Sequence, residues 1–382
     1  MLRICFSFIA ATLILNASRA QGAQSYVYVE SNIGSVPGQN SVYAFANDGL
    51  GNLVGLAGSP YLSGGTGVSV PGSSELNADQ EVTANAAGTA LYAVNGHTNS
   101  IAGFAVNGDG TLTSLPGSPY ASGGQDPVSI GLFGSFVVVA NKNFDPNQDI
   151  DGDVPNYTTF SVKRDGSLRQ NPGSTFDLAA ASGPSQALVY GRSHLVFGLE
   201  LFTSRIASYR YDRNGLLSEV SSIGPTTTNG AFLGESVHPR QRVLYAGLLQ
   251  TNELGVYRFD PTGAISFARA VPNEGIDICW LRMNSTGTRL YSSESVTNTL
   301  TVYDTTDALN PVQIQHLTLN VHDGFVINIE LDPTGDFLYA VAGHGIHTLN
   351  VDADGLLNQS VAPVILPTAN TDTPIGLAVI RK

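Results

Sequence analysis

The chain has 382 residues, of which 13% are charged and 42% are hydrophobic, and it contains 42 glycines. Its formal net charge of −13 argues against nucleic acid and anionic membrane surfaces as partners, because these are bound through clusters of Lys and Arg. It has two cysteines, and Cys5 lies in the N-terminal segment, so a mature chain would keep Cys279 alone and form no internal disulfide.

The first twenty residues have the pattern of a secretory signal peptide. Arg3 gives a basic start, residues 4–15 are apolar, and Ser18-Arg-Ala20 provides the small residues of a cleavage site, with Ala23 as a later option. The apolar stretch is too short to be a stable bilayer anchor. We therefore expect residues 1–20 to be removed, and residues 21–382 to form a single secreted or periplasmic domain that is not bound to a membrane.

An apolar strand recurs about every 50 residues through the rest of the chain. Its marker residues are Tyr28, Tyr92, Val138, Phe197, Tyr245, Tyr291 and Tyr339. In most units the next strand carries a residue that is usually aromatic, and a turn glycine follows it six positions later. These glycines are Gly49, Gly110, Gly166, Gly215, Gly263 and Gly355. The unit around Tyr303 lacks this glycine. Repeats of about 40 to 50 residues, built of short strands and glycine turns, are typical of a β-propeller, in which one unit is one four-stranded blade.

The unit around Tyr92 shows the expected strands of one blade. They are predicted over residues 81–84, 90–94, 100–106 and 111–115. Asn-Gly and Asp-Gly pairs between them supply the positive φ that tight hairpins need. The first unit begins directly at a second strand, residues 26–29, whereas the chain ends on an unpaired strand, residues 374–380. We therefore predict an all-β, seven-bladed β-propeller whose ring is closed by the C-terminal strand.

The stretches Leu91-Tyr-Ala-Val-Asn-Gly-His-Thr-Asn-Ser-Ile101 and Leu338-Tyr-Ala-Val341 resemble the YVTN-like repeats of the seven-bladed lactonase family, which includes bacterial 6-phosphogluconolactonases and fungal carboxymuconate-lactonizing enzymes. In that family the fourth unit reads Gly-Pro-Arg-His and then Asn-Glu-Leu, and the resemblance implies site roles for the Arg, His and Glu. The residues that match are Gly183, Pro184, Glu200 and Leu201, whereas Ser185 and Gln186 stand where Arg and His are expected.

The residue three positions after each strand marker is predicted to lie at the mouth of the central channel. These residues are Ser31, Asn95, Asn141, Glu200, Leu248, Glu294 and Ala342. Glu200 and Glu294 are the candidate catalytic acid and base. Asn95 and Asn141 are candidate ligand-binding residues, together with His97 and His344 two positions further along. The alternative is that these strand ends are polar because they meet water and cap backbone groups.

A long loop in the third unit has the spacing of a calcium loop. Asn147, Asp149, Asp151 and Asp153 place oxygen ligands at alternate positions. The pattern departs at the twelfth position, where Thr158 replaces the bidentate Glu. An acidic solvated turn is the alternative. We expect no required cofactor, with Ca²⁺ in this loop as the candidate metal.

Two functions are compatible with these residues. The first is an exported, monomeric propeller that binds a small molecule or a protein partner at its loop face. The second is a lactone hydrolase or cycloisomerase that uses Glu200. A lactone opening needs a proton carrier and a cation for the developing oxyanion or a substrate carboxylate, and neither Ser185 nor Gln186 replaces them. We favour the binding function and leave open whether the chain is an enzyme.

Overall fold

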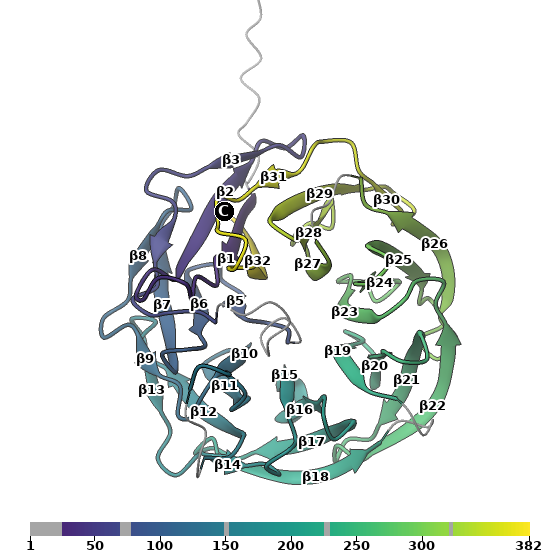
Figure 1. Ribbon diagram of the computed structural model, residues 1–382. Coiled ribbons are helices and arrows are strands. Elements are labelled where there is room, and N and C mark those ends of the chain that lie inside the picture. Colours follow the sequence, from purple (N-terminus) through teal and green to yellow (C-terminus); the bar gives the residue numbers. More distant parts are fainter. Residues whose placement is uncertain (1–24, 69–77, 149–152, 225–229, 321–323) are drawn as a thin grey trace, which may run out of the picture.

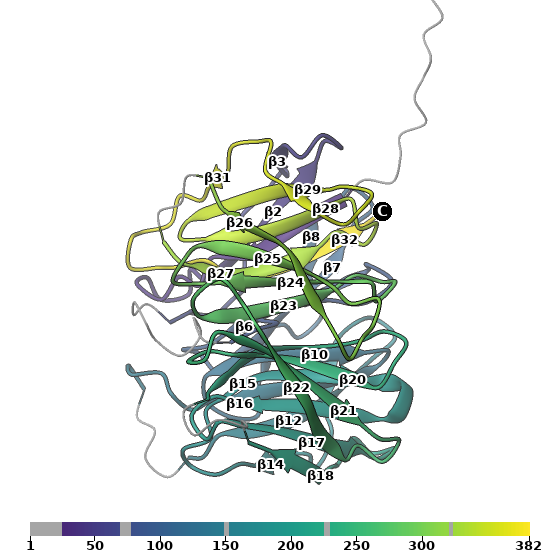
Figure 2. The same cartoon turned by 90° about the vertical axis from the view of Figure 1, so that its right-hand side faces the viewer.

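Short antiparallel strands form seven sheets, and the sheets are arranged around a central axis (Figure 1). The computed structural model describes residues 25–68, 78–148, 153–224, 230–320 and 324–382. The sheets follow one another as layers when the ring is seen edge-on (Figure 2), so the strands between the axis and the rim are buried on both faces. The prediction of an all-β, seven-bladed propeller is confirmed.

We number the blades by their order in the chain and name their strands a to d from the axis outward. The a strands of blades 1 to 7 are β32 (Ile375–Arg381), β5 (Val82–Ala84), β10 (Pro127–Phe133), β15 (Pro184–Tyr190), β19 (Phe232–Val237), β23 (Ile278–Met283) and β27 (Val326–Leu331). The b strands are β1 (Ser25–Glu30), β6 (Ala90–Asn95), β11 (Phe136–Asn141), β16 (Leu195–Glu200), β20 (Val243–Leu248), β24 (Arg289–Glu294) and β28 (Phe337–Ala342).

The outer strands complete each sheet. The c strands are β2 (Ser41–Asn47), β7 (Ser100–Val106), β12 (Asn156–Val162), β17 (Arg205–Tyr211), β21 (Glu253–Phe259), β25 (Thr299–Asp304) and β29 (Gly345–Val351). The d strands are β3 (Leu53–Gly55), β8 (Leu112–Ser114), β13 (Leu168–Gln170), β18 (Leu217–Ile223), β22 (Ile265–Pro272), β26 (Val312–Thr318) and β30 (Leu357–Asn358). Four two-residue strands also pair with c strands: β4 (Tyr61–Leu62), β9 (Tyr120–Ala121), β14 (Phe176–Asp177) and β31 (Val364–Ile365).

A short 3₁₀ turn, η2 (Gly191–Ser193), joins β15 to β16. The part of the chain described here contains no helix that is long and apolar enough to cross a membrane. The predicted strands of blade 2 agree with β5, β6, β7 and β8 to within one residue at each end.

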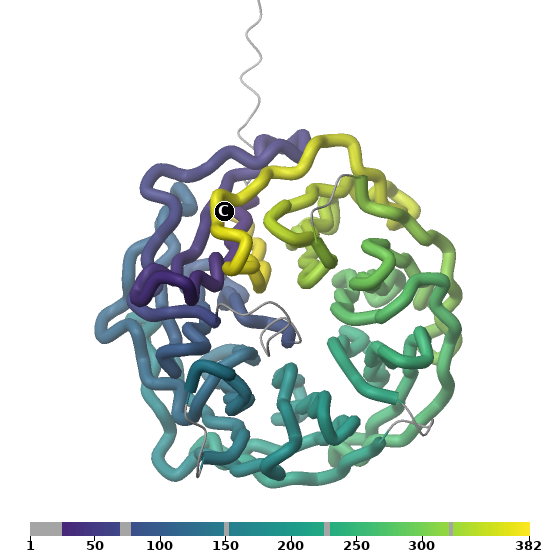
Figure 3. Tube along the Cα trace, viewed as in Figure 1, coloured from purple at the N-terminus to yellow at the C-terminus, as the bar shows by residue number. Residues whose placement is uncertain are grey.

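The C-terminal strand closes the ring, as predicted. β32 pairs with β1 in antiparallel register, with Tyr28 opposite Ala378 and Val27 opposite Val379. In Figure 3 the C-terminal trace lies beside the first strands of the chain. This pairing gives blade 1 its a strand, so neither end of the chain leaves an open sheet edge at the seam.

The repeated tyrosine and the repeated turn glycine belong to one interaction between neighbouring blades. The hydroxyl of Tyr28 in blade 1 donates a hydrogen bond of 2.7 Å to the carbonyl of Gly110 in blade 2. The same bond joins Tyr92 to Gly166 and Tyr291 to Gly355. Gly110 has φ +80°, and a Cβ there would lie 2.2 Å from the Tyr26 ring. Glycine is therefore required both by the turn and by the close approach of the preceding blade.

Blades that lack the strand-b tyrosine or the turn glycine still form an inter-blade hydrogen bond, with a different donor or acceptor. Where the b-strand residue is Val138 or Phe197, the strand-c hydroxyl opposite it takes over. Thr159 donates to the carbonyl of Gly215 at 2.8 Å, and Ser208 donates to that of Gly263 at 2.6 Å. In the unit without a turn glycine, Tyr245 donates to the carbonyl of Ala308 at 2.7 Å. At the seam, Asn47 donates to the Tyr339 hydroxyl at 2.6 Å.

The antiparallel strand order divides the loops between two faces. The b–c and d–a connections lie at one end of the strands, which we call the loop face. The a–b and c–d turns, which carry the repeated glycines, lie at the other end, the turn face. Segments of different blades can therefore meet at the loop face while the turns hold the ring together.

Replacement of Tyr28 by Phe should destabilise the protein. The hydroxyl and the Gly110 carbonyl are both buried, so the variant loses a hydrogen bond and leaves the carbonyl without this donor. We expect the free energy of unfolding to fall by about 1 to 2 kcal/mol in urea titrations. Tyr61→Phe is the control, because its hydroxyl donates to an exposed carbonyl, that of Ala57. Equal stability of Tyr28→Phe and wild type would contradict the role of this bond.

Candidate functional site

The predicted polar strand ends lie at the loop-face ends of the b strands, and they are buried. Asn95, Asn141, Glu200 and Glu294 are each at most 1% exposed. They belong to blades 2, 3, 4 and 6, and no hydrogen bond or ion pair is found between any two of them among the described residues. The structure therefore places them at equivalent positions without bringing them together.

The two asparagines connect loops of the same or neighbouring blades. Asn95 accepts a hydrogen bond of 3.0 Å from Asn40 in the b–c loop of blade 1. Asn141 donates one of 2.9 Å to Asn156, the first residue of the following c strand. His344 is half-buried, and its Nε2 is 3.4 Å from the carbonyl oxygen of Ala369.

Glu200 is surrounded by hydrogen-bond donors of its own blade. Its Oε1 accepts from Arg205 at 2.7 Å and from the Tyr209 hydroxyl at 3.3 Å, and its Oε2 accepts from Thr203 at 2.9 Å. Arg205 also forms an ion pair with Glu219. The Glu200 carboxylate is thus engaged on both oxygens, which limits its use as a proton acceptor.

Glu294 is held by uncharged donors. Ser292, Thr299 and Asn273 donate to it at 2.5, 2.9 and 2.9 Å, and Asn273 comes from the d–a connection of the preceding blade. Burial raises the pKa of Glu294 to about 7, although these hydrogen bonds oppose the shift. The carboxyl group therefore titrates near neutral pH.

A histidine and a buried aspartate meet at the loop face between blades 2 and 3. His97 Nδ1 lies 2.6 Å from Asp145 Oδ2. The Asp145 side chain is fully buried, whereas that of His97 is 38% exposed. The other aspartate oxygen accepts the backbone N–H of Asn147 at 2.8 Å. The carboxylate therefore fixes the Nδ1 edge of the imidazole, while the His97 side chain stays partly exposed.

The same loop places one exposed aromatic ring against a second exposed ring from blade 4. Phe144, the residue before Asp145, contacts Phe202 from blade 4 with ring centroids 4.9 Å apart. Their exposed fractions are 47% and 46%. The ammonium group of the buried Lys142 lies 5.4 Å from the centroid of the Phe202 ring, within the range of a cation–π interaction. We call Phe144 and Phe202 the aromatic pair.

Asp126, which immediately precedes strand a of blade 3, anchors this loop. Its carbonyl accepts the backbone N–H of Lys142 at 2.8 Å, and its Oδ2 accepts that of Phe144 at 3.1 Å. Both contacts fix the backbone of residues 142–145, which join His97 of blade 2 to Phe202 of blade 4. Loop geometry thus assembles side chains from three blades.

A polar cavity of about 460 Å³ adjoins this segment on the loop face. It is lined by Gly123, Gly124, Gln125, Asp153, Val154, Asn156, Thr175 and Asp177. Asn143 borders it, since its backbone N–H donates to the Gln125 carbonyl at 3.1 Å and its Nδ2 donates to the Asp153 carbonyl at 3.0 Å. The volume lies in the range of small-molecule sites.

An arginine that the sequence analysis did not single out lies on the innermost strand of blade 6. Arg282 binds both oxygens of the buried Asp79 at 2.6 and 2.7 Å, and its Nε binds Glu330 of blade 7 at 2.8 Å. Burial lowers the pKa of Arg282, but the two carboxylates together outweigh it and raise the pKa above its ordinary value, so Arg282 stays charged. Its donors serve an internal ion network, so it is not free to bind an anionic ligand.

Residues 78–81 link several a strands across the axis. The Trp280 indole donates to the carbonyl of Ala78 at 2.6 Å. Asp79 N–H donates to the carbonyl of Ser185 at 2.9 Å, and the carbonyl of Gln80 accepts the N–H of Ile130 at 2.9 Å. Blades 3, 4 and 6 are thereby tied to the segment that precedes β5.

Two buried carboxyl groups lie next to this network. Both oxygens of Glu235 and Oε1 of Glu81 have no hydrogen-bond partner among the described residues. Burial raises the pKa of each well above its ordinary value, and Asp79 raises both further. Asn328 donates to the other Glu81 oxygen at 3.2 Å.

The two positions at which the chain departs from the lactonase pattern have structural partners. Ser185 donates to the carbonyl of Leu199 at 3.3 Å. Gln186 spans blades 4 and 5: it accepts the backbone N–H of Glu235 at 2.6 Å and donates to the Glu235 carbonyl at 3.2 Å. A β-bulge between Pro184 and Gln186 turns the strand at this point.

The candidate calcium loop is described only in part. Asn147 and Asp153 are described, whereas Asp149 and Asp151 lie outside the described residues. Within the described ranges no group of three or more His, Cys, Asp or Glu side chains is arranged to hold a metal ion. Asp153 forms a hydrogen bond with the Gln125 amide.

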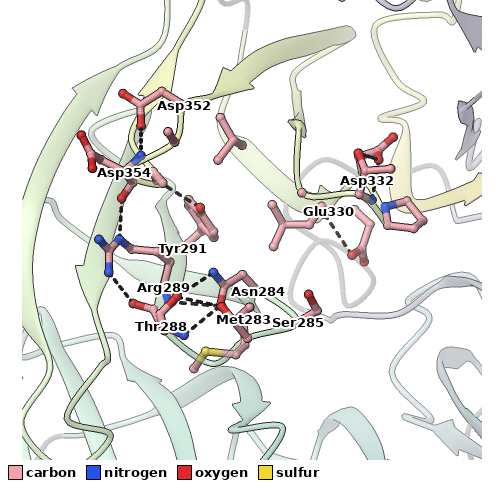
Figure 4. Close-up of a pocket in the computed structure, with 18 of the residues that line it drawn as sticks. Met283, Asn284, Ser285, Thr288, Arg289, Tyr291, Glu330, Asp332, Asp352 and Asp354 are labelled. Carbon is pink, nitrogen blue, oxygen red and sulfur yellow. Dashed lines mark hydrogen bonds between the residues drawn. The ribbon is translucent and has the colours of Figure 1, made fainter. Parts of the chain in front are cut away.

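A larger cavity, of about 640 Å³, lies on the turn face between blades 6 and 7 (Figure 4). Two of the carboxylates that line it, Asp332 and Asp352, cap the turns that form its walls. Asp332 accepts the backbone N–H of Thr334 at 2.7 Å, and Asp352 accepts that of Asp354 at 2.9 Å. Because these groups are committed to the turns, we place the candidate site on the loop face.

Sequence reasoning identified His97 but not its partner or the aromatic pair. Asp145 precedes the candidate calcium ligands and carries no motif of its own. Phe144 and Phe202 are 58 positions apart in the chain, and only the blade arrangement brings them together. A local signal was present in Lys142-Asn-Phe-Asp145, where an apolar ring stands in a loop that is otherwise polar.

Glu294→Gln should change how stability depends on pH. The folded-state pKa of about 7 lies above the ordinary value of 4.5, so Glu294 contributes stability below pH 4.5 that is lost as the pH rises through 7. When the pH is raised from 5 to 8, the free energy of unfolding of wild type should decrease because Glu294 ionises. We expect the decrease to be smaller in the variant, by about 2 to 3 kcal/mol. Urea titrations at the two pH values measure this difference. Parallel losses in both proteins would contradict the elevated pKa.

Comparisons with known proteins agree with this fold. No family model matches the chain, and no curated protein matches its sequence. Two solved structures provisionally assigned as 6-phosphogluconolactonases are similar to it. The one from Bacteroides fragilis is 16% identical over 93% of this chain and 98% of its own, with a TM-score of 0.71. The one from Bacteroides uniformis is 15% identical over 94% and 100%, with a TM-score of 0.73.

A third similar structure is the periplasmic gluconolactonase of Pseudomonas aeruginosa. It is 13% identical over 93% of this chain and 99% of its own, with a TM-score of 0.68. Because the sequence identities are this low, the similarity shows a shared fold and nothing about function. The expected resemblance is confirmed at that level, and the chain has the seven-bladed propeller fold of these lactonases.

Proposed function

We propose that this protein is an exported propeller that binds a small, neutral, hydroxyl-bearing ring compound at its loop face. The observation that carries the proposal is one loop that presents Phe144 to Phe202 and borders, through Asn143, a polar cavity of about 460 Å³. An apolar platform beside hydrogen-bonding groups is the usual composition of a small-molecule site. The predicted signal peptide supports export.

The aromatic pair supplies the apolar part of the site. Rings that remain nearly half exposed lose unfavourable contact with water when a ligand covers them. The backbone of Phe144 is fixed by Asp126, so little conformational entropy is lost when a ligand binds. A flat ligand face with exposed C–H groups, as in a sugar ring, complements this platform.

Charge determines which ring compounds fit. Asp153 and Asp177 line the cavity, and the chain has a formal net charge of −13. These charges repel phosphate and carboxylate groups, whereas carboxylate and carboxamide oxygens accept hydrogen bonds from hydroxyl groups. The ligand class is therefore a neutral sugar or sugar lactone, and a phosphorylated sugar is disfavoured.

Hydrolysis of a neutral lactone is the second candidate function. It is supported by the likeness of the fold to a periplasmic gluconolactonase. The catalytic role first assigned to Glu200 has less support, because Arg205, Thr203 and Tyr209 already donate to its two oxygens. A reaction at the loop face needs a base with a free lone pair.

Removal of either ring of the aromatic pair should weaken ligand binding. We expect Phe144→Ala and Phe202→Ala each to reduce the affinity for neutral sugars or lactones about 3- to 10-fold, as the loss of one stacking contact implies. Isothermal titration with a panel of methyl glycosides, sugar lactones and 6-phosphogluconate measures these affinities.

Phe133→Ala is the matched control, because Phe133 is also half exposed but lies on the turn face. It should bind like wild type. The proposal fails if 6-phosphogluconate binds more tightly than every neutral compound, or if Phe133→Ala weakens binding as much as the loop-face variants.

Export predicts a shortened mature chain. We expect N-terminal sequencing of protein from the native host to start near Gln21 or Gln24, because the basic start, the apolar stretch and the small-residue site occur together. A cytoplasmic product that retains Met1 would contradict export.

A further inference from the structure

We infer that His97 is a general base for lactone opening at the loop face and that Asp145 positions it. This inference rests on the second candidate function proposed above. It assigns the proton carrier to blades 2 and 3, away from Ser185 and Gln186 of blade 4.

The contact between His97 and Asp145 has the geometry of a positioned base. The distance of 2.6 Å between Nδ1 and Oδ2 is that of a strong charge-assisted hydrogen bond. Asp145 is itself fixed by the backbone N–H of Asn147 at 2.8 Å. The carbonyl of His97 accepts a hydrogen bond from the Gln148 amide, and Asn99 donates to the Gln148 oxygen at 3.1 Å. Backbone and ring are thus both held.

The carboxylate selects the tautomer of the imidazole. Ionised Asp145 accepts hydrogen bonds and donates none, so the neutral ring carries its proton on Nδ1. The lone pair is then on Nε2, the nitrogen that Asp145 does not contact. A base needs this combination of a free lone pair and a partner that stabilises the cation formed.

The imidazole and the aromatic pair are connected through one loop. Asp145 follows Phe144 directly, so their Cα atoms are about 3.8 Å apart and the imidazole is tied to the next residue of the same fixed loop. His97 is thus linked through Asp145 to the loop that carries Phe144. Residues 142–145 thus contain both a ring of the platform and the partner of the base.

The reaction balances with water as the second reactant. Nε2 takes a proton from water while the water oxygen forms a bond to the lactone carbonyl carbon. The ring C–O bond then breaks, and its oxygen takes the proton from Nε2. The product is the hydroxy acid, and His97 returns to its neutral form. Asp145 stays ionised throughout and stabilises the imidazolium.

A purely structural ion pair predicts something different. Such a pair would affect stability, but it would leave the chemistry of a bound lactone unchanged. Tautomer and turnover separate the two roles, so the test measures both.

The first measurement needs no substrate. ¹⁵N-detected NMR of the full mature chain at pH 8.5, where an ordinary histidine is neutral, reports which nitrogen carries the proton. We expect the His97 signals to show a protonated Nδ1 and an unprotonated Nε2 in wild type, and a mixture in Asp145→Asn. A proton on Nε2 in wild type would overturn the inference.

The second measurement follows acid release from a panel of five- and six-membered lactones, including glucono-1,5-lactone. We expect His97→Asn to reduce kcat about 10²-fold or more with KM nearly unchanged, and Asp145→Asn to show most of that loss. His194→Asn is the control, because His194 is exposed on the turn face with φ 53°, a conformation that Asn accepts.

The outcomes distinguish the inference from the function on which it depends. Turnover by wild type that persists in His97→Asn would overturn the role of His97 and leave lactone hydrolysis in place. Absence of turnover by wild type on the whole panel would remove both, while binding at the aromatic pair is judged separately. The inference is supported if His97→Asn loses activity but keeps the KM and melting temperature of wild type, and if His194→Asn has wild-type activity.

Discussion

The ring depends on a hydrogen bond that leaves one blade and ends in the c–d turn of the next. A tyrosine hydroxyl of strand b reaches the carbonyl of a turn glycine, as between Tyr28 and Gly110. The acceptor is a backbone group, so it is present whatever side chain the donor strand carries. The donor varies: Thr159 and Ser208 take over where the tyrosine is absent. The blades are therefore fixed at the turn face, and the loop face is left to vary between blades.

The axis of the ring is closed by internal polar contacts. Arg282, which is charged, is neutralised by Asp79 and Glu330, and Gln186 bridges two blades through backbone groups. Buried polar groups are costly unless they are paired, so these residues are committed to the fold. Where the lactonase pattern has an arginine and a histidine, this chain uses Ser185 and Gln186 for structure. Any chemistry must come from elsewhere on the loop face.

One loop of blade 3, together with residues of blades 2 and 4, supplies candidate groups elsewhere on the loop face. Asp126 fixes the backbone of residues 142–145, and the loop in turn presents Phe144 to Phe202 and Asp145 to His97. The proposed preference for neutral, hydroxyl-rich ligands over anions rests on the carboxylates that line the cavity and on the negative net charge of the chain. This short segment holds both the exposed ring of Phe144 and the carboxylate that contacts the His97 imidazole. The proposed binding and the proposed proton transfer therefore both depend on it.

The sequence by itself determined the architecture, because strand spacing, hairpin turns and positive-φ glycines are local properties that repeat with each blade. It predicted seven blades, their strand limits in blade 2 and the closing strand, and it marked His97. The partners of these residues depended on tertiary structure. Asp145 is 48 positions from His97, and Asp79 is 203 positions from Arg282. Such contacts depend on the angle between neighbouring blades and on the path of individual loops. A periodic sequence pattern specifies neither of these. The same strand position that holds Asn95 in one blade holds Glu294 in another, and only burial decided that the carboxyl group titrates near pH 7.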